Sequence, residues 1–154
     1  MTGSCFVIGV GVDVVDIPSF AEQLGMPGSR FAASFTGAER RTCAKQARTS
    51  GNEAQHLAAR WAAKEAFYKA WTAAEAGDEI PGAEMDWSLI EVVKDRWGRP
   101  FLRLHEPLAS VVTGALARHF GGGATDSGHA VWHLSLSHDG PVAQAFVVGE
   151  WRRM

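Results

Sequence analysis

Residues 61–71 read Trp61-Ala-Ala-Lys-Glu-Ala-Phe-Tyr-Lys-Ala-Trp71, a run that is rich in alanine and free of glycine and proline. Such a composition predicts the interior of a helix. Glu65 and Lys69 then lie one turn apart on one face of that helix. The opposite face carries mostly small residues suited to close packing, namely Ala59, Ala63, Ala66, Phe67 and Ala70. We therefore expect the acid and the base to point away from a tightly packed surface.

The Glu65–Lys69 pair has two interpretations. A glutamate followed by a lysine four residues later is a common surface pair that stabilises a helix by roughly 0.2–0.5 kcal/mol. In the half-apolar setting that Trp61 and Tyr68 provide, the same pair could bind a metal and a phosphate. The helix alone does not decide between them, so the choice depends on the other motifs.

Length, charge and cysteine content limit the classes of protein. A chain of 154 residues is expected to form one domain, residues 1–154, with a genuine core. A formal net charge of -2 argues against a general binder of nucleic acid or anionic membranes. Cys5 and Cys43 are too few for a disulfide scaffold and favour free thiols in a reducing cytosol. The short apolar run 5–12 predicts neither a signal peptide nor a membrane span, so we expect a cytoplasmic protein.

The pattern of elements predicts an α+β protein. In chain order we expect a strand (5–12), three helices (16–25, 36–47 and 52–74), two strands (87–94 and 99–104), a helix (107–120) and two strands (131–136 and 142–148), with loops at 77–86 and 121–128. The order β-α-α-α-β-β-α-β-β lacks regular βαβ alternation, which is why the class is α+β.

Several local signals set the ends of these elements. Thr36 and Glu39 fit a capping box at the start of the second helix. Asp16 is expected to cap the first helix, with Pro18 in its first turn. Ser50 is expected to cap the long helix, and residues 95–98 predict a hairpin turn.

Asp13 closes the sequence Gly9-Val-Gly11-Val-Asp13 at the end of an apolar strand. Ligands often bind at such a position, and the two glycines let another backbone or a phosphate approach. The alternative is that Asp13 only ends the strand or caps a turn. Without a third glycine the motif is too weak to indicate a dinucleotide site.

A third cluster, Ser135-Leu-Ser137-His138, precedes a Gly-Pro turn. Its hydroxyls and imidazole could bind a phosphate, whereas a serine hydrolase would need a nucleophile elbow that the sequence lacks. The other histidines give weak signals. His129 and His133 share no metal signature, and three more are expected on solvated helix faces or strand edges: His56, His105 and His119.

Taken together and in this order, the three clusters strongly resemble the phosphopantetheinyl transferases, specifically the short holo-acyl-carrier-protein synthase type. The similarity spans nearly the whole chain and is most specific in the helix motif. Further matches are Phe35-Thr36-x-x-Glu39, Arg60, Trp97-Gly98-x-Pro100 and Ala143-x-Ala145. The motifs Ile17-Pro18-x-Phe20, Glu39-Arg-Arg41 and His56-Leu-Ala-Ala-Arg-Trp61 look most like actinobacterial members.

The resemblance implies a fold, a reaction and a site. The fold has a small antiparallel sheet packed on the long helix. The reaction moves the 4'-phosphopantetheine arm of coenzyme A to a serine of an apo acyl carrier protein or a carrier domain of a fatty acid synthase, and releases 3',5'-ADP. Asp13, Glu65 and Lys69 would be catalytic. The two acids would hold Mg2+ or Mn2+, and Lys69 would stabilise or protonate the departing phosphate. Coenzyme A would contact Arg60, Lys64, Pro100, Ser137 and His138.

The resemblance also implies partners. Short members are typically homotrimers in which one subunit supplies the metal ligands and its neighbour part of the coenzyme A pocket. Many carry basic residues in the first helix that grip the carrier protein, whereas this chain has Pro18 and Ser19 there. A basic run on the second helix could replace them, or could be an ordinary solvated face: Arg40, Arg41, Lys45 and Arg48.

Two other functions compete with transfer. A coenzyme A or nucleotide-binding module would use the same basic groups but would not need Glu65 and Lys69 together. A structural or interaction protein could use the six tryptophans as interface anchors, although tryptophans also suit a core.

Overall fold

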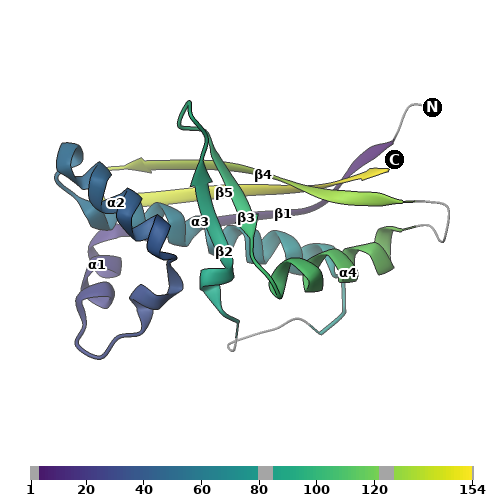
Figure 1. The fold of residues 1–154 in the computed structure, drawn as a ribbon, viewed down its shortest axis with the longest axis horizontal. Helices are drawn as coiled ribbons and strands as arrows, with labels where there is room; N and C mark the ends of the chain where they lie inside the picture. The colour runs from purple at the N-terminus through teal and green to yellow at the C-terminus, as the bar shows by residue number, and fades with distance from the viewer. Residues whose placement is uncertain (1–3, 80–84, 122–126, 154) are drawn as a thin grey trace.

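A computed structural model describes residues 4–79, 85–121 and 127–153 (Figure 1). In chain order the elements are β1 (Cys5–Asp16), α1 (Ile17–Gly25), η1 (Phe31–Ser34), α2 (Gly37–Ser50), α3 (Glu53–Ala74), η2 (Trp87–Leu89), β2 (Ile90–Lys94), β3 (Pro100–Leu104), α4 (Leu108–Phe120), β4 (Gly128–Asp139) and β5 (Val142–Arg153). The predicted α+β class and the order of helices and strands are confirmed. The predicted loops at 77–86 and 121–128 lie partly outside the described residues.

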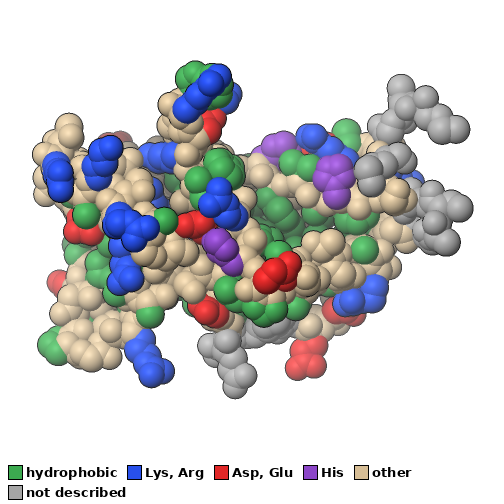
Figure 2. Space-filling view, in the orientation of Figure 1, with side chains coloured by type: hydrophobic (Ala, Val, Ile, Leu, Met, Phe, Trp, Pro, Cys, Tyr) green, Lys and Arg blue, Asp and Glu red, His purple; other side chains and the backbone are tan. Residues whose placement is uncertain are grey.

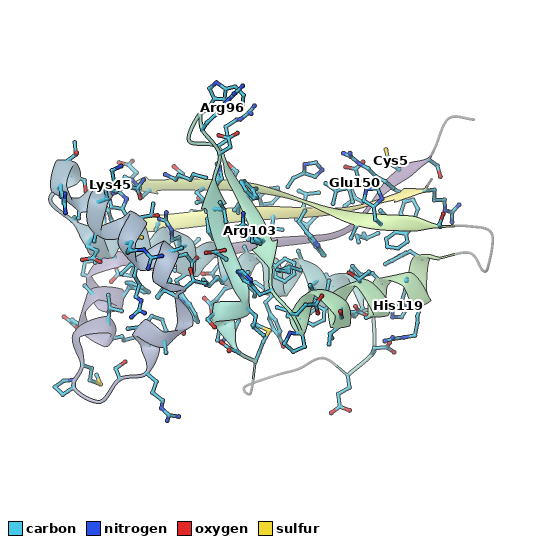
Figure 3. The ribbon with its side chains drawn as sticks, in the orientation of Figure 1. Cys5, Lys45, Arg96, Arg103, His119 and Glu150 are labelled. Carbon is cyan, nitrogen blue, oxygen red and sulfur yellow. The ribbon has the colours of Figure 1, made fainter. Side chains whose placement is uncertain are left out.

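The strands form two antiparallel sheets where one was expected. β1, β5 and β4 form a three-stranded sheet in that order, and β2 pairs with β3. The three long strands lie along α3, with α1 and α2 at one end and α4 towards the other (Figure 1). The β2–β3 hairpin crosses the long strands, and its tip, where Figure 3 labels Arg96, projects from the body. Among the described segments, no helix has the length and apolar character needed to cross a lipid bilayer.

The inner face of β1 lies directly against α3. A Cβ on Gly11 would lie 1.8 Å from the carbonyl oxygen of Ala66, and one on Gly9 would lie 2.0 Å from that of Ala70. Both alanines are completely buried. The expected small-residue face of the helix therefore packs on the glycines of the strand, backbone against backbone. Because alternate residues of a strand share a face, Asp13 points to the same helix as the glycines.

Most predicted caps are confirmed. The backbone N–H of Glu39 donates to Thr36 Oγ1 at 3.1 Å, and Glu39 Oε2 accepts from the Thr36 N–H at 2.9 Å. Asp16 caps α1 by accepting from the Ser19 N–H at 2.9 Å. The cap assigned to Ser50 was wrong, because α2 continues through that residue and Asn52 caps α3.

Several strand boundaries also differ from the expected ones. β1 continues past its predicted end at residue 12, because it pairs with β5 as far as Asp16–Val142, so Asp13 lies within the strand. Residues 87–89 form a 3-10 turn, not the start of a strand, because the Asp86 carboxylate accepts from the Ser88 N–H at 2.9 Å and starts a helical turn. β4 and β5 are longer than predicted because they pair with each other from Gly128–Arg153 to Asp139–Val142. The two strands form a hairpin, and β5 also pairs with β1 along nearly its whole length, so pairing extends both strands beyond the apolar runs that predicted them.

Replacing Gly11 with alanine is expected to lower the free energy of unfolding by about 3 kcal/mol or more, because the new methyl group would overlap the Ala66 carbonyl oxygen. Urea denaturation followed by tryptophan fluorescence measures the change. Gly25→Ala is the matched control, because a Cβ there meets no atom within 4 Å. Equal effects of the two substitutions would show that the β1–α3 contact is not a critical packing constraint.

Candidate active site

Asp13, Glu65 and Lys69 meet where β1 passes α3. Lys69 Nζ donates to Asp13 Oδ1 at 2.7 Å and to the Val12 carbonyl oxygen at 3.1 Å. The Asp13 side chain is 10% exposed, while that of Lys69 is 54% exposed. The structure thus brings together the three residues that the sequence suggested as catalytic, with Asp13 buried, Glu65 half-buried and the ammonium of Lys69 reaching towards the surface.

The two carboxyl groups are close enough to influence each other. Burial raises the pKa of Glu65 to about 7, and the hydrogen bonding and negative charge of Asp13 add to this effect, whereas Lys69 opposes it. Asp13 Oδ2 is buried and has no hydrogen-bond partner. A pair of converging carboxyls with one unpaired oxygen suits a hard divalent cation, which takes oxygen ligands and cancels like-charge repulsion.

A pocket of about 370 Å³ lies on another side of α3. It gathers side chains from α2, α3, the β2–β3 hairpin and the end of β4. Four of the five residues expected to contact coenzyme A line it: Arg60, Pro100, Ser137 and His138. Residues far apart in the sequence therefore meet around one cavity.

This pocket is crowded with basic groups. Arg60 is 2% exposed, and its Nε atom is buried without a hydrogen-bond partner. Burial lowers the pKa of Lys94, and the charge of Arg60 lowers it further. The pKa of His56 is lowered by burial and then by Arg60, His138 and Lys94. Cations that repel one another in a shared cavity favour an anionic ligand, which would relieve that repulsion.

Sequence reasoning missed two of these pocket residues. His56 was expected on a solvated helix face. It is half-buried and lines the pocket, where its ring lies beside that of His138 with 6.2 Å between centroids. Lys94 ends β2 and carries no local signal of function. Both positions gain significance only when α3, the hairpin and β4 come together.

The pocket and the carboxyl pair lie on different sides of α3. Arg60 and Glu65 are five residues apart, which separates their directions by about 140° around the helix axis. One chain therefore presents two groups of ligand-binding residues that do not face each other.

Comparison with known proteins identifies the family. The sequence profile of the 4'-phosphopantetheinyl transferase superfamily matches residues 9–122. The chain belongs to this superfamily. It is 42% identical over 144 residues to the holo-[acyl-carrier-protein] synthase of Mycobacterium ulcerans, covering 94% of this chain and 97% of the relative. It is 44% identical to that of Corynebacterium efficiens, covering 92% and 93%.

Solved structures agree with this assignment. An ACPS–CoA complex of Chronobacterium ammoniagenes superposes with a TM-score of 0.76 at 38% identity, covering 98% of both chains. The apo-ACPS structure from the same organism gives 0.78 at 40% identity, covering 98% and 99%. The phosphopantetheinyl transferase fold and the resemblance to actinobacterial members are thereby confirmed.

The prediction that Lys64 contacts coenzyme A is wrong. Lys64 is completely buried, and its ammonium group donates to Glu39 Oε2 at 2.9 Å and to three carbonyl oxygens. Those carbonyls belong to Ser34, Trp87 and Ile90. The three protons of the ammonium group are shared among these four acceptors, so Lys64 has none left for a phosphate. Glu39 also accepts from the Val92 N–H at 2.9 Å, so the Lys64–Glu39 ion pair connects α3 to α2 and β2.

The basic run on α2 is exposed in the transferase. Figure 2 shows lysine and arginine side chains gathered over this helix, and Figure 3 labels Lys45 on it. The run comprises Arg40, Arg41, Lys45 and Arg48. Its exposure is compatible with both interpretations of the sequence, a docking surface or an ordinary solvated face.

Glu65→Gln should become more stable relative to the wild-type transferase as the pH rises from about 5 to 8 in the presence of EDTA. Between pH 4.5 and about 7 the folded wild type binds a proton at Glu65 that the unfolded chain has lost. The proton stabilises the folded wild type at low pH, and this contribution is lost as the pH rises through the pKa of the folded state. The Glu65→Gln variant has no such titrating group, so its stability does not change in this way.

Thermal unfolding at both pH values measures this effect. Glu22→Gln, which changes an exposed carboxylate of α1, is the matched control and should show no such trend. Parallel pH profiles for Glu65→Gln and the wild type would contradict the raised pKa.

Proposed function

We propose that this chain transfers the 4'-phosphopantetheine moiety of coenzyme A to a serine of an apo acyl carrier protein and releases 3',5'-ADP. The observation that carries the proposal is the convergence of Asp13, Glu65 and Lys69 in a chain of this superfamily. Relatives named holo-[acyl-carrier-protein] synthase, and a similar structure solved with CoA, support it.

Asp13 and Glu65 would hold Mg2+, or Mn2+ in its place. The unpaired Asp13 Oδ2 and the neighbouring carboxyl of Glu65 suit an ion with hard oxygen ligands. When bound, the ion neutralises the diphosphate of coenzyme A as negative charge shifts during transfer.

Lys69 is positioned to act on the leaving group. Two of its N–H groups donate to Asp13 and to the Val12 carbonyl, so one remains for a phosphate oxygen. In the reaction the serine oxygen forms a bond to the phosphorus of phosphopantetheine. The bond from that phosphorus to the oxygen of 3',5'-ADP breaks, and the serine proton passes to solvent. Lys69 stabilises the charge that develops on 3',5'-ADP.

The basic pocket would hold the phosphate of coenzyme A that is distant from the reacting bond, the 3'-phosphate of the ribose. Arg60, Ser137 and His138 offer N–H and O–H donors, and Lys94 adds positive charge. Pro100 contributes an apolar surface at the same pocket. Binding energy from these groups would orient the diphosphate for in-line transfer.

Asp13→Asn and Glu65→Gln should abolish transfer, and Lys69→Ala should lower kcat by about 100-fold or more. Coenzyme A binding should weaken much less in Lys69→Ala, because its proposed contribution is greatest in the transition state. Holo-carrier formation followed by mass spectrometry measures the rates, and thermal unfolding checks that each variant folds. Undiminished transfer by Glu65→Gln would contradict the assignment, and equal losses of binding and turnover would restrict Lys69 to substrate binding.

We further propose that the chain acts as a homotrimer with shared active sites. The outer face of the three-stranded sheet carries apolar side chains that the rest of the described chain leaves exposed, among them Val10 (48%), Val12 (45%), Val14 (60%) and Phe146 (45%). Further copies of the chain would cover this face. The divergence of Arg60 and Glu65 around α3 supports a site that combines the pocket of one subunit with the carboxyl pair of its neighbour.

Mixing two inactive variants tests the shared site. Asp13→Asn lacks a metal ligand, and Arg60→Met lacks a pocket cation while keeping the side chain long. Co-expressed chains should recover about a quarter of wild-type activity, because random association pairs an intact pocket with an intact carboxyl pair at that frequency. Native mass spectrometry confirms that mixed trimers form. Mixed trimers without activity would place each site within one chain.

The proposed reaction leads to proposals for the cellular location, the pathway and the docking surface of the enzyme. We propose that the enzyme works in the cytoplasm, in fatty acid biosynthesis, as one domain of 154 residues. Acyl carrier proteins are acidic, so the exposed basic face of α2 is a suitable docking surface for one.

A further inference from the structure

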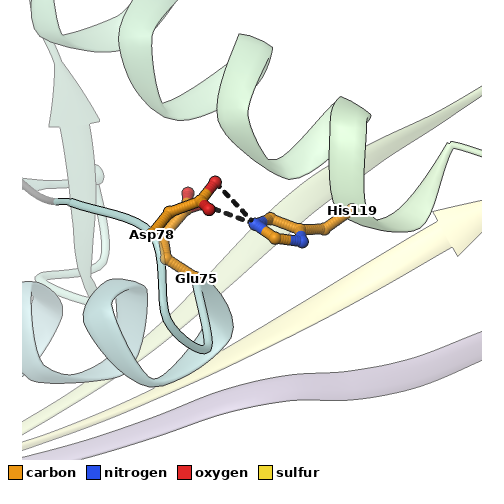
Figure 4. A group of neighbouring side chains, drawn as sticks. All are labelled: Glu75, Asp78 and His119. Atoms are coloured by element: carbon orange, nitrogen blue, oxygen red, sulfur yellow. Dashed lines mark hydrogen bonds and ion pairs between the residues drawn. The ribbon is translucent and has the colours of Figure 1, made fainter.

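A second group of ligand-type side chains lies where α3 ends beside α4 (Figure 4). Glu75 is the residue that caps α3, Asp78 lies in the turn that follows, and His119 is in the last turn of α4. Their potential ligand atoms all lie within 4.8 Å of one another. Glu75 is ten residues beyond Glu65, or about 15 Å along the helix axis, so this group is separate from the proposed active site.

Glu75 is an unusual side chain for a helix end. It is 1% exposed, and its Oε1 atom accepts a hydrogen bond from Trp71 Nε1 at 2.7 Å. Its Oε2 atom is also buried but receives no hydrogen bond. A buried carboxylate oxygen without a donor is costly unless a positive charge lies beside it. The side chain therefore directs an unsatisfied acceptor towards the cluster.

The imidazole of His119 cannot satisfy both carboxylates. Its Nε2 atom lies 3.2 Å from Glu75 Oε2 and 3.1 Å from Asp78 Oδ2. One imidazole nitrogen carries at most one proton, so it can make only one full hydrogen bond. Figure 4 shows both contacts converging on this nitrogen.

The distances suit a small metal ion between the three side chains. Zinc lies about 2.0–2.2 Å from nitrogen and carboxylate ligands, so ligand atoms around a tetrahedral zinc lie roughly 3.3–3.5 Å apart. The separations from His119 Nε2 to the two carboxylates, 3.1 and 3.2 Å, need only a slight expansion, and the two carboxylate oxygens lie within 4.8 Å of each other. The side chains of His119 and Asp78 are 31% and 53% exposed, which leaves access for water as a fourth ligand.

The surroundings also favour a cation. α3 ends at Ala74 and α4 ends at Phe120, so both helices present their negative C-terminal ends near the cluster. A nitrogen ligand beside two carboxylates favours zinc over magnesium, which prefers oxygen ligands alone.

We propose that Glu75, Asp78 and His119 bind a zinc ion that joins the C-terminal ends of α3 and α4. The ion would stabilise the far end of the helix that carries Glu65 and Lys69, without touching the reacting groups. This inference does not depend on the proposed transfer reaction.

Metal titration of chelator-treated protein tests the proposal. The protein carries Asp13→Asn and Glu65→Gln, so that the carboxyl pair of the proposed active site cannot take the ion. Calorimetry should show one Zn2+ bound per chain, and Zn2+ should raise the Tm. Co2+ should produce a visible absorption band that Zn2+ then removes.

Adding His119→Ala or Asp78→Asn should weaken Zn2+ binding by about tenfold or more. His105→Ala is the matched control and should leave it unchanged. His105 also contacts a buried carboxylate, that of Glu91, but Arg103 already supplies a cation there. Stoichiometric binding that neither His119→Ala nor Asp78→Asn weakens would overturn the proposal, as would the absence of binding. In the latter case, a lower Tm of His119→Ala in EDTA would identify a plain ion pair.

Discussion

The backbone contact between β1 and α3 is the constraint on which the rest of the structure depends. Gly9 and Gly11 bring the strand onto Ala66 and Ala70 with no space for a methyl group. The next inward residue of the strand is Asp13, so the same contact that closes the core presses a carboxylate against the helix that carries Glu65 and Lys69. The raised pKa of Glu65 and the unpaired oxygen of Asp13 are consequences of that enforced proximity. Packing and chemistry thus share one set of residues.

Much of this arrangement could be predicted from the sequence because its causes are local. Alternating glycines before Asp13, an alanine-rich helix face and the Thr36–Glu39 capping box each act within a few residues. The order of elements followed from such signals, and the resemblance to the transferases added the assignment of Asp13, Glu65 and Lys69. What the helix motif could not reveal was which of its two lysines is buried and which is exposed. Lys69 reaches the surface, whereas Lys64 is buried against Glu39.

Most of the features that sequence reasoning missed depend on contacts between segments that are distant in the sequence. His56 and Lys94 become part of a basic pocket only because the hairpin and the end of β4 lie beside α3. The separation of the strands into two sheets, and the full length of β4 and β5, are likewise set by pairing partners and not by local propensity. His119 shows the same limit, since its two carboxylate neighbours come from the end of another helix.

We propose that this chain moves phosphopantetheine from coenzyme A to a carrier protein with the help of a divalent metal. The most direct measurement is the intact mass of an apo acyl carrier protein after incubation with this protein, coenzyme A and Mg2+, beside a control containing EDTA. We expect a gain of one phosphopantetheine unit that EDTA prevents. No gain with several apo carrier proteins, despite measurable binding of coenzyme A, would contradict it and would indicate a binding module instead.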